Sequence, residues 1–288
     1  MSINLLIKNL KFLFKNKIQE QIVSKTDLEA AIEEKIIEMS NIDCYPNIMG
    51  LDETYEKVKN GASLIRFGDG ELSLINGNDI PFQKYNSILG KRLAEILSTV
   101  NSNICIAIPT FIFKNKDNLN DISKDFWTKN GKKFRDSIQK YISKDNKYYA
   151  AEISIANEAY KNIDKDKYFE KMKKIWSGKD ITIICGKTVF KKIDYNIFSS
   201  AKNIEYIHAP SINAYSEYEK IKTKAIEINK NKLVILILGP TAKLLAYDLA
   251  LLGYQALDIG HIAKSYDWYK KGKSTINMDD AVEFFNPD

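Results

Sequence analysis

Short apolar runs alternate with stretches of helical periodicity along most of the chain. Residues 180–186 (DITIICG) and 232–240 (KLVILILGP) are apolar almost throughout, as expected of strands buried on both faces. Residues 125–142 and 241–253 instead repeat apolar positions every three to four residues, as amphipathic helices do. The alternation predicts an α/β protein with a mostly parallel sheet and helices on both faces. The predicted strands are residues 62–67, 103–109, 180–186, 203–210, 232–240 and 254–260.

The first 48 residues do not show this alternation of strands and helices, and we interpret them as a helical N-terminal extension before a domain of residues 49–288. Residues 3–18 place apolar side chains at helical spacing and lysines over much of the remaining surface. Such a basic amphipathic helix can make peripheral contact with an anionic membrane. It can equally pack on the domain or on a partner chain, and the sequence leaves both alternatives open.

Composition narrows the classes of partner and compartment. The chain has 288 residues and a formal net charge of +6, but its basic residues are interspersed with acidic ones. No nucleic-acid-binding module is recognisable, so we expect no nucleic-acid partner. Cys105 and Cys185 lie in apolar runs and are expected to be core residues in a reducing compartment. No apolar run approaches the about 18 residues of a membrane span, so we expect a cytoplasmic protein, with contact to the inner membrane face as an alternative.

The motif RFGDGE ends the first predicted strand and carries two neighbouring carboxylates, Asp69 and Glu71. Like charges so close repel each other where they are poorly solvated, and a divalent cation would remove that cost. Mg²⁺ and Mn²⁺ take carboxylate and phosphate oxygens as ligands. The alternative is an ordinary strand-to-helix turn in which one of the two carboxylates caps the following helix.

Other predicted strands also end in polar residues and glycines, and in a parallel sheet these ends meet at one edge. A glycine-proline turn opening a helix, as in LGPTAK, suits a diphosphate because free backbone N–H groups point outward there. Neither a G-x-G-x-x-G nor a G-x-S-x-G motif is present, so a dinucleotide cofactor and a serine-hydrolase elbow are disfavoured. The candidate residues at these strand ends are Gly186, Lys187, Gly239, Pro240, Thr241, Lys243, Asp258 and His261.

Two motifs together resemble one known family. RFGDGE at residues 66–71 and LGPTAKLLAYDLALLGYQALDIGH at residues 238–261 are similar to the bacterial GT-D type glycosyltransferases, and the resemblance covers roughly residues 50–275. It implies a Rossmann-like α/β fold and a Mn²⁺- or Mg²⁺-dependent transfer of a sugar from a nucleotide-sugar donor, typically UDP-glucose. The acceptor implied is a hydroxyl group of a glycan or glycoprotein.

The resemblance also implies roles for individual residues. Asp69 and Glu71 would lie at the metal and the donor diphosphate, with His261 as a less certain third metal ligand. Asp258 and His261 are candidates for the base that deprotonates the acceptor, and Glu152 is a poorer one. Trp127, Tyr148 and Tyr149 are candidates for stacking on the acceptor, although helix packing is the more common role of such residues. The expected donor-binding residues are Arg66, Phe67, Gly68, Gly70, Gly186, Lys187, Gly239, Pro240 and Thr241.

Two other classes of function use the same features. A metal-dependent phosphoesterase or nucleotide-sugar hydrolase would need no acceptor, and a non-catalytic sugar-nucleotide-binding assembly protein would bind the donor without turnover. The sequence leaves open the sugar, the acceptor, the linkage, the anomeric outcome and the oligomeric state, a homo-oligomer included.

Overall fold

The computed structural model describes residues 46–113, 116–275 and 277–285, together with Leu28, Ile32 and Lys35. The chain divides into two compact units, residues 1–41 and 42–288, and the fold below is that of the second unit. Residues 3–18, which form the predicted basic helix, lie outside the described residues, as does Cys44. The predicted boundary after residue 48 falls at the end of a strand of the main sheet, so the domain begins before residue 49.

A single sheet of eight parallel strands organises the domain, in the order β1-β4-β3-β2-β8-β7-β5-β6. Each of the predicted apolar runs contains one of its strands, so the predicted parallel α/β class is confirmed. The strands are β1 (Asn47–Ile48), β2 (Ser63–Arg66), β3 (Ile104–Ile108), β4 (Lys147–Ala150), β5 (Asp180–Gly186), β6 (Asn203–Ala209), β7 (Leu233–Ile237) and β8 (Ala256–Asp258).

Two strands, β1 and β4, have no counterpart among the predicted runs. β1 is only two residues long and lies at an edge of the sheet. β4 has the sequence KYYA, in which an exposed lysine and a half-buried tyrosine interrupt the buried positions. Neither segment has the continuous apolar character that marks a central parallel strand, so the pattern of hydrophobic residues does not reveal them.

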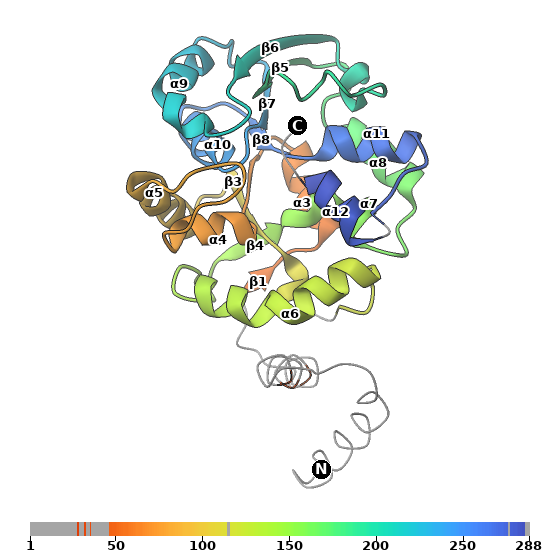
Figure 1. The fold of residues 1–288 in the computed structure, drawn as a ribbon. Helices are drawn as coiled ribbons and strands as arrows, with labels where there is room; N and C mark the ends of the chain where they lie inside the picture. Colours follow the sequence, from red (N-terminus) through yellow and green to blue (C-terminus); the bar gives the residue numbers. More distant parts are fainter. Residues whose placement is uncertain are drawn as a thin grey trace, which may run out of the picture. The chain divides into compact units, whose positions relative to one another are not determined.

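Helices cover both faces of the sheet, as Figure 1 shows. Short 3-10 segments, among them η1 (Thr110–Ile112) and η2 (Ala151–Ser154), follow directly after strand ends. The described α-helices are α3 (Leu51–Lys59), α4 (Asp69–Ile75), α5 (Ser87–Leu97), α6 (Asp121–Ile138), α7 (Ala156–Ala159), α8 (Lys165–Lys173), α9 (Tyr218–Ile226), α10 (Thr241–Leu251), α11 (Ile262–Lys270) and α12 (Met278–Phe285).

The core has two layers because successive side chains of a strand point to opposite faces of the sheet. In β2, Ile65 packs into the layer that contains Leu93 of α5. Its neighbour Leu64 packs into the layer that contains Val58 of α3 and Met172 of α8. All five side chains are at most 2 % exposed, so the sheet is buried on both faces. Since all the strands run the same way, their C-terminal ends meet at one edge, and the polar motifs of the sequence gather there.

Candidate active site

A cavity of about 790 Å³ lies at the C-terminal edge of the sheet. Its lining comes from the ends of β2, β3, β4, β5, β7 and β8 and from helices α4, α6, α7, α10, α11 and α12. Most of the candidate residues from the sequence line it, so the prediction that the polar strand ends converge is borne out by the geometry. These lining residues are Arg66, Phe67, Gly68, Asp69, Gly70, Glu71, Glu152, Gly186, Gly239, Pro240, Lys243, Asp258 and His261.

Two predicted donor-binding residues lie outside this lining. Lys187 follows β5 but its side chain is exposed. Thr241 begins α10 and is fully buried, with a hydroxyl oxygen that has no hydrogen-bond partner. The strand-end rule places a residue near the edge of the sheet, but it does not fix the direction in which the side chain points.

The motif RFGDGE turns from β2 into α4, with Gly68 just before the helix and the two carboxylates in its first turn. Glu71 is 8 % exposed, and its Oε2 accepts the Gly68 N–H at 2.8 Å. This contact is the capping role that the sequence offered as an alternative to metal binding. A negative side chain in the first turn also interacts favourably with the helix dipole.

Asp69 presents an accessible carboxylate to the same cavity. Because the cavity is concave, protein atoms surround the carboxylate although solvent reaches it. The pKa of Asp69 is raised, first by this desolvation and then by the negative charge of Glu71, while the N–H groups of Asp69 and Gly70 act in the opposite direction.

Lys243 of α10 links the acids of two strand ends. Its Nζ lies 3.1 Å from Glu71 Oε1 and 3.1 Å from Asp258 Oδ2, and the residue is only 6 % exposed. Asp258 is 1 % exposed and also accepts the Arg66 backbone N–H, while the Arg66 guanidinium lies 3.7 Å from its Oδ1. Two cations therefore balance two buried carboxylates, which offsets the cost of removing them from water.

Arg66 joins three strand ends through its guanidinium. Its Nε donates to the Asp258 carbonyl at 2.8 Å, and its Nη1 donates to the Ala151 carbonyl at 3.1 Å. Gly260 lies against this group with φ +43°, and a Cβ atom there would overlap Arg66 Nη2. The glycine of the DIGH motif thus serves both a left-handed backbone and the close approach of an arginine.

His261 precedes α11 and packs among aromatic rings. Its ring centroid is 6.1 Å from that of Phe82, 5.6 Å from that of Phe284 and 5.4 Å from that of Phe285. Desolvation lowers the pKa of His261 to about 3, and the positive charges of Arg66, Lys264 and Lys243 contribute further. The imidazole is therefore neutral at pH 7 and is a weak base.

Glu152 is a stronger acid–base candidate in the structure than in the sequence. It lines the cavity at 2 % exposure, and its Oε1 accepts hydrogen bonds from the hydroxyl groups of Thr110 and Tyr160. Burial raises its pKa, although these hydroxyl donors act in the opposite direction. A buried carboxyl group with a raised pKa in a cavity is a typical arrangement for proton transfer.

Glu158 also lines the cavity, and the sequence gave no signal for it. Its Oε2 accepts the N–H and the hydroxyl of Thr275, each at 3.0 Å, and its Oε1 accepts Asn157 Nδ2 at 2.7 Å. Thr275 lies just before α12, so Glu158 fixes the segment that leads into this helix. The residue follows β4, and it could be placed at a strand end only if that strand had been recognised.

The three aromatic candidates for an acceptor site lie in different parts of the structure. Trp127 of α6 lines the cavity, but it is 8 % exposed and packs against Phe111 and Phe134. Tyr148 is 1 % exposed in the core, and neither it nor Tyr149 lines the cavity. Helix packing was the alternative considered for these residues, whereas the two tyrosines lie on the strand β4 and pack within the sheet.

The donor atoms present are compatible with a divalent cation at Asp69 and Glu71. Each carboxylate has about four lone-pair sites, and Gly68 and Lys243 use only part of those of Glu71. Nucleotide-bound Mg²⁺ commonly takes one or two carboxylates and completes its shell with phosphates and water. Among the described residues, no group of three or more His, Cys, Asp or Glu side chains is arranged to hold a metal, so His261 does not form a three-ligand site with them.

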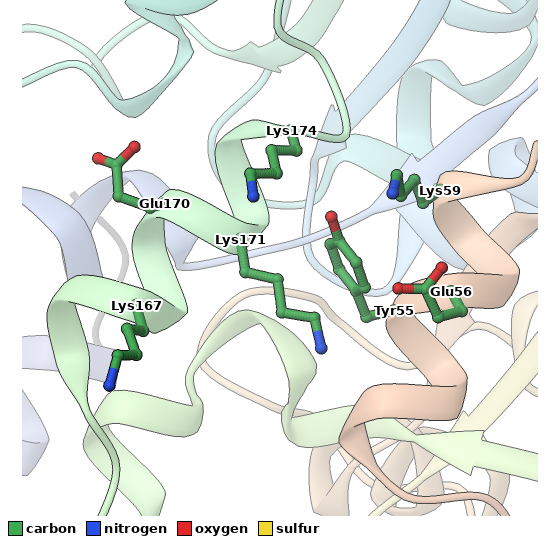
Figure 2. A pocket seen from close by; sticks show the side chains of 7 residues that line it. All are labelled: Tyr55, Glu56, Lys59, Lys167, Glu170, Lys171 and Lys174. Carbon is green, nitrogen blue, oxygen red and sulfur yellow. The ribbon is translucent and has the colours of Figure 1, made fainter.

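A second, shallower hollow lies between α3 and α8, as Figure 2 shows. Lysines dominate its lining, and Lys171 lies over the Tyr55 ring at 4.4 Å from the centroid while also pairing with Asp52. The C-terminal ends of α3 and α8 lead toward the starts of β2 and β5, so this hollow lies toward the opposite edge of the sheet. It shares no lining residue with the strand-end cavity and holds no candidate reacting group.

A parallel sheet with acids, cations and glycines around a cavity at its C-terminal edge defines an α/β enzyme of the Rossmann-like class. Over residues 64–282 the chain matches the family described as Glycosyltransferase GT-D fold, and it belongs to that family. The resemblance of its two motifs to this family is thereby confirmed.

Named relatives and solved structures agree with this family. The chain is 34 % identical over 261 residues, 90 % of its length, to the probable glycosyl transferase Gly of Streptococcus gordonii. It is 29 % identical over 252 residues, 83 % of its length, to the glycosyltransferase GlyD of Streptococcus pneumoniae. These matches span 36 % and 31 % of the relatives' own lengths, so the chain corresponds to about a third of each.

Two solved structures share the fold. One is described as a highly conserved domain of unknown function 1792 with a distinct glycosyltransferase fold; the TM-score is 0.76 at 32 % identity, covering 88 % of both chains. The other is described as a new glycosyltransferase from Streptococcus sanguinis, with a TM-score of 0.75 at 33 % identity, covering 80 % of this chain and 87 % of that one. Within the described part of the chain, no helix is long and apolar enough to span a bilayer.

Proposed function

We propose that this glycosyltransferase transfers a sugar, with glucose as the first candidate, from a UDP-sugar to a hydroxyl group of a glycan or glycoprotein, with the help of Mn²⁺ or Mg²⁺. The observation that carries the proposal is the convergence of Asp69 and Glu71 with Arg66 and Lys243 in one strand-end cavity. A donor diphosphate needs positive charge around it, and a divalent cation needs carboxylate oxygens.

The chain's own residues surround the predicted diphosphate site with hydrogen-bond donors and carboxylates. Arg66 and Lys243 place N–H donors next to the cavity, where they would hydrogen-bond the leaving diphosphate, while Glu71 and Asp258 balance their charge. Helix α10 begins at the same edge after Gly239 and Pro240, so the positive end of its dipole lies at the predicted diphosphate site, although the N–H groups of Ala242 and Lys243 bond the carbonyls of Gly239 and Pro240. A divalent cation, when bound at Asp69 and Glu71, would neutralise further negative charge of the diphosphate.

Glu152 is the best-supported base for the acceptor hydroxyl. Asp258 is 1 % exposed and its carboxylate is engaged by Arg66 and Lys243, so it offers little free surface to an acceptor hydroxyl. His261 has a pKa lowered to about 3 and is a weak base. Glu152 combines a raised pKa with a place in the cavity lining, which supports a role in proton transfer.

The test is UDP release from a panel of UDP-sugars in the presence of Mn²⁺, with and without EDTA. Asp69→Asn should lower release by about 100-fold because it removes a ligand of the cation, and EDTA should do the same to the wild type because it removes the cation itself. Asp79→Asn is the matched control, since Asp79 also lines the cavity but bonds Lys84 and the Tyr85 N–H.

Different outcomes separate the functions. Release that rises when a saccharide acceptor is added supports transfer, whereas release that no saccharide changes supports the nucleotide-sugar hydrolase. Full activity of Asp69→Asn in EDTA would contradict the metal role. Binding of UDP-sugar without any release would favour the non-catalytic alternative.

A further inference from the structure

We propose that one side of the cavity is an acceptor subsite for a saccharide that carries an apolar group next to the reacting sugar, and this inference rests on the proposed glycosyltransferase function. The subsite, here called the apolar wall, consists of Ile122 and Phe126 of α6 and Met278, Ala281, Val282 and Phe285 of α12.

Helix α12 has two apolar faces, and one of them carries its fully buried residue, Phe284. Phe284 is 0 % exposed, with its ring centroid 5.2 Å from that of Trp268 and 5.6 Å from that of His261. Lys264 Nζ donates to the Glu283 carbonyl at 2.9 Å and fixes the end of the helix. These contacts anchor α12 to α11.

The second apolar face of α12 borders the cavity. Met278, Ala281, Val282 and Phe285 follow one another at intervals of three, one and three residues, which places them on one helical stripe. All four line the cavity, yet Met278 is 55 %, Val282 52 % and Phe285 42 % exposed. An apolar stripe that borders a cavity and stays accessible to solvent is typical of a ligand-binding surface.

Helix α6 contributes to the lining of the same cavity with similar chemistry. Ile122 and Phe126 are half-buried, and the Phe126 ring packs edge-on against Trp127 at 5.0 Å between centroids. This edge-to-face contact helps to hold the Phe126 ring in place on the apolar side of the cavity.

The charges of the cavity identify which substrate meets the apolar wall. The donor is an anionic nucleotide sugar, and the cations that suit it, Arg66 and Lys243, lie at the strand ends. The apolar wall offers neither a cation nor a hydrogen-bond donor side chain to a diphosphate. A glycosyltransferase must hold both substrates in contact, and we assign the wall to an acceptor with an apolar substituent. The titration of Val282→Asn with UDP below decides between this acceptor and the uracil base of the donor.

Calorimetric titration of the full chain, saturated with UDP and Mn²⁺, tests this inference. The probes are glucose, phenyl β-glucoside and octyl β-glucoside. Their affinities are compared for the effect of the substituent alone, so the natural sugar need not be known. Both glycosides should bind at least about tenfold more tightly than glucose, because burying a phenyl ring or a short alkyl chain is favourable by that order. The ratio between the two glycosides distinguishes a planar group from an alkyl chain.

Val282→Asn should remove most of this gain and leave the affinity for UDP unchanged. Met278→Gln is a second wall variant, and both positions are more than half exposed, so neither substitution disturbs packing. Val100→Asn is the matched control, since Val100 is 75 % exposed and lies outside the cavity lining.

Equal affinities for glucose and its two glycosides in the wild type would overturn the inference. So would a loss of UDP affinity in Val282→Asn, because the wall would then hold the donor. Failure of the proposed function would look different: no UDP-sugar would release UDP under any condition, whatever the glycosides do.

Discussion

Lys243 shows how the immediate surroundings of a residue change its expected role. The sequence analysis associated the two acids of RFGDGE with a divalent cation and named Lys243 only as a further candidate residue at a strand end. In the structure its ammonium group lies between Glu71 and Asp258, so these carboxylates are balanced before any metal binds. Asp69 and Glu71 remain predicted metal ligands, and the cap at Gly68 is the alternative that the sequence offered. The pairing with Lys243 was visible only once α4, α10 and β8 had been brought together.

The titration of Glu152 gives a pH-dependent prediction at the same scale. Its pKa is raised above the ordinary 4.5 in the folded state, so the folded protein binds more protons than the unfolded chain just above pH 4.5. The free energy of unfolding therefore decreases as the pH rises through this window. Glu152→Gln should abolish that part of the pH dependence, which urea denaturation between pH 4 and pH 8 can measure.

Glu95→Gln is the control for this experiment, because Glu95 has a 61 % exposed side chain on α5. It should leave the pH dependence of unfolding unchanged. An identical pH profile for wild type and Glu152→Gln would show that Glu152 titrates normally in the folded state.

At the scale of elements, the loops after the strands require glycine at certain positions. The sequence showed this requirement only in part. The motif DIGH marked Gly260 as part of a site, but its left-handed φ of +43° and its contact with Arg66 come from the packing of β8 against β2. The same scale explains why β4 was missed and Glu158 with it. A strand of four residues with two polar or half-buried positions has too little periodicity to be recognised.

Gly260→Ala should both strain the loop and displace Arg66. A non-glycine residue at positive φ costs about 1 kcal/mol or more of unfolding free energy. The added Cβ would also push the guanidinium away from Asp258, and we expect the affinity for UDP to fall about tenfold as fixed positive charge is lost. Urea denaturation and calorimetric titration with UDP measure the two effects.

Gly253→Ala distinguishes the effect of backbone strain from the effect of displacing Arg66. Gly253 also has a positive φ, +86°, but a Cβ there would meet no atom within 4 Å. This variant should lose a similar amount of stability and keep the affinity of the wild type for UDP. Equal UDP affinities in both variants would argue against a role for Arg66 in binding the donor.

At the scale of the whole domain, one sheet couples two helical layers. Strands β2, β5, β7 and β8 contribute side chains to both layers, so neither layer can keep its core if the sheet is lost. The mostly parallel α/β class could be predicted because buried parallel strands are continuously apolar. The order of the strands could not, since pairing joins segments that lie far apart in the chain, such as β2 and β8.

Substitutions in the two layers should therefore shift the same unfolding transition. Leu93→Ala in one layer and Met172→Ala in the other each remove a buried side chain, at a cost of about 2–5 kcal/mol. Far-ultraviolet and near-ultraviolet circular dichroism should report coincident urea transitions in both variants. Leu251→Ala, at a 57 % exposed position, should change the stability by less than about 0.5 kcal/mol, and separate transitions in either core variant would contradict the coupling.

The sequence by itself determined the alternation of strands and helices, the strand ends that carry polar residues, and the family resemblance of two motifs. These features are local, because periodicity and turn chemistry depend on residues a few positions apart. The tertiary structure decided that Lys243 balances Glu71 and Asp258, that Glu152 and Glu158 enter the cavity, and that α12 turns an apolar stripe toward it. Charge balance, burial and the shape of a cavity depend on segments that the chain separates and only the folded sheet brings together.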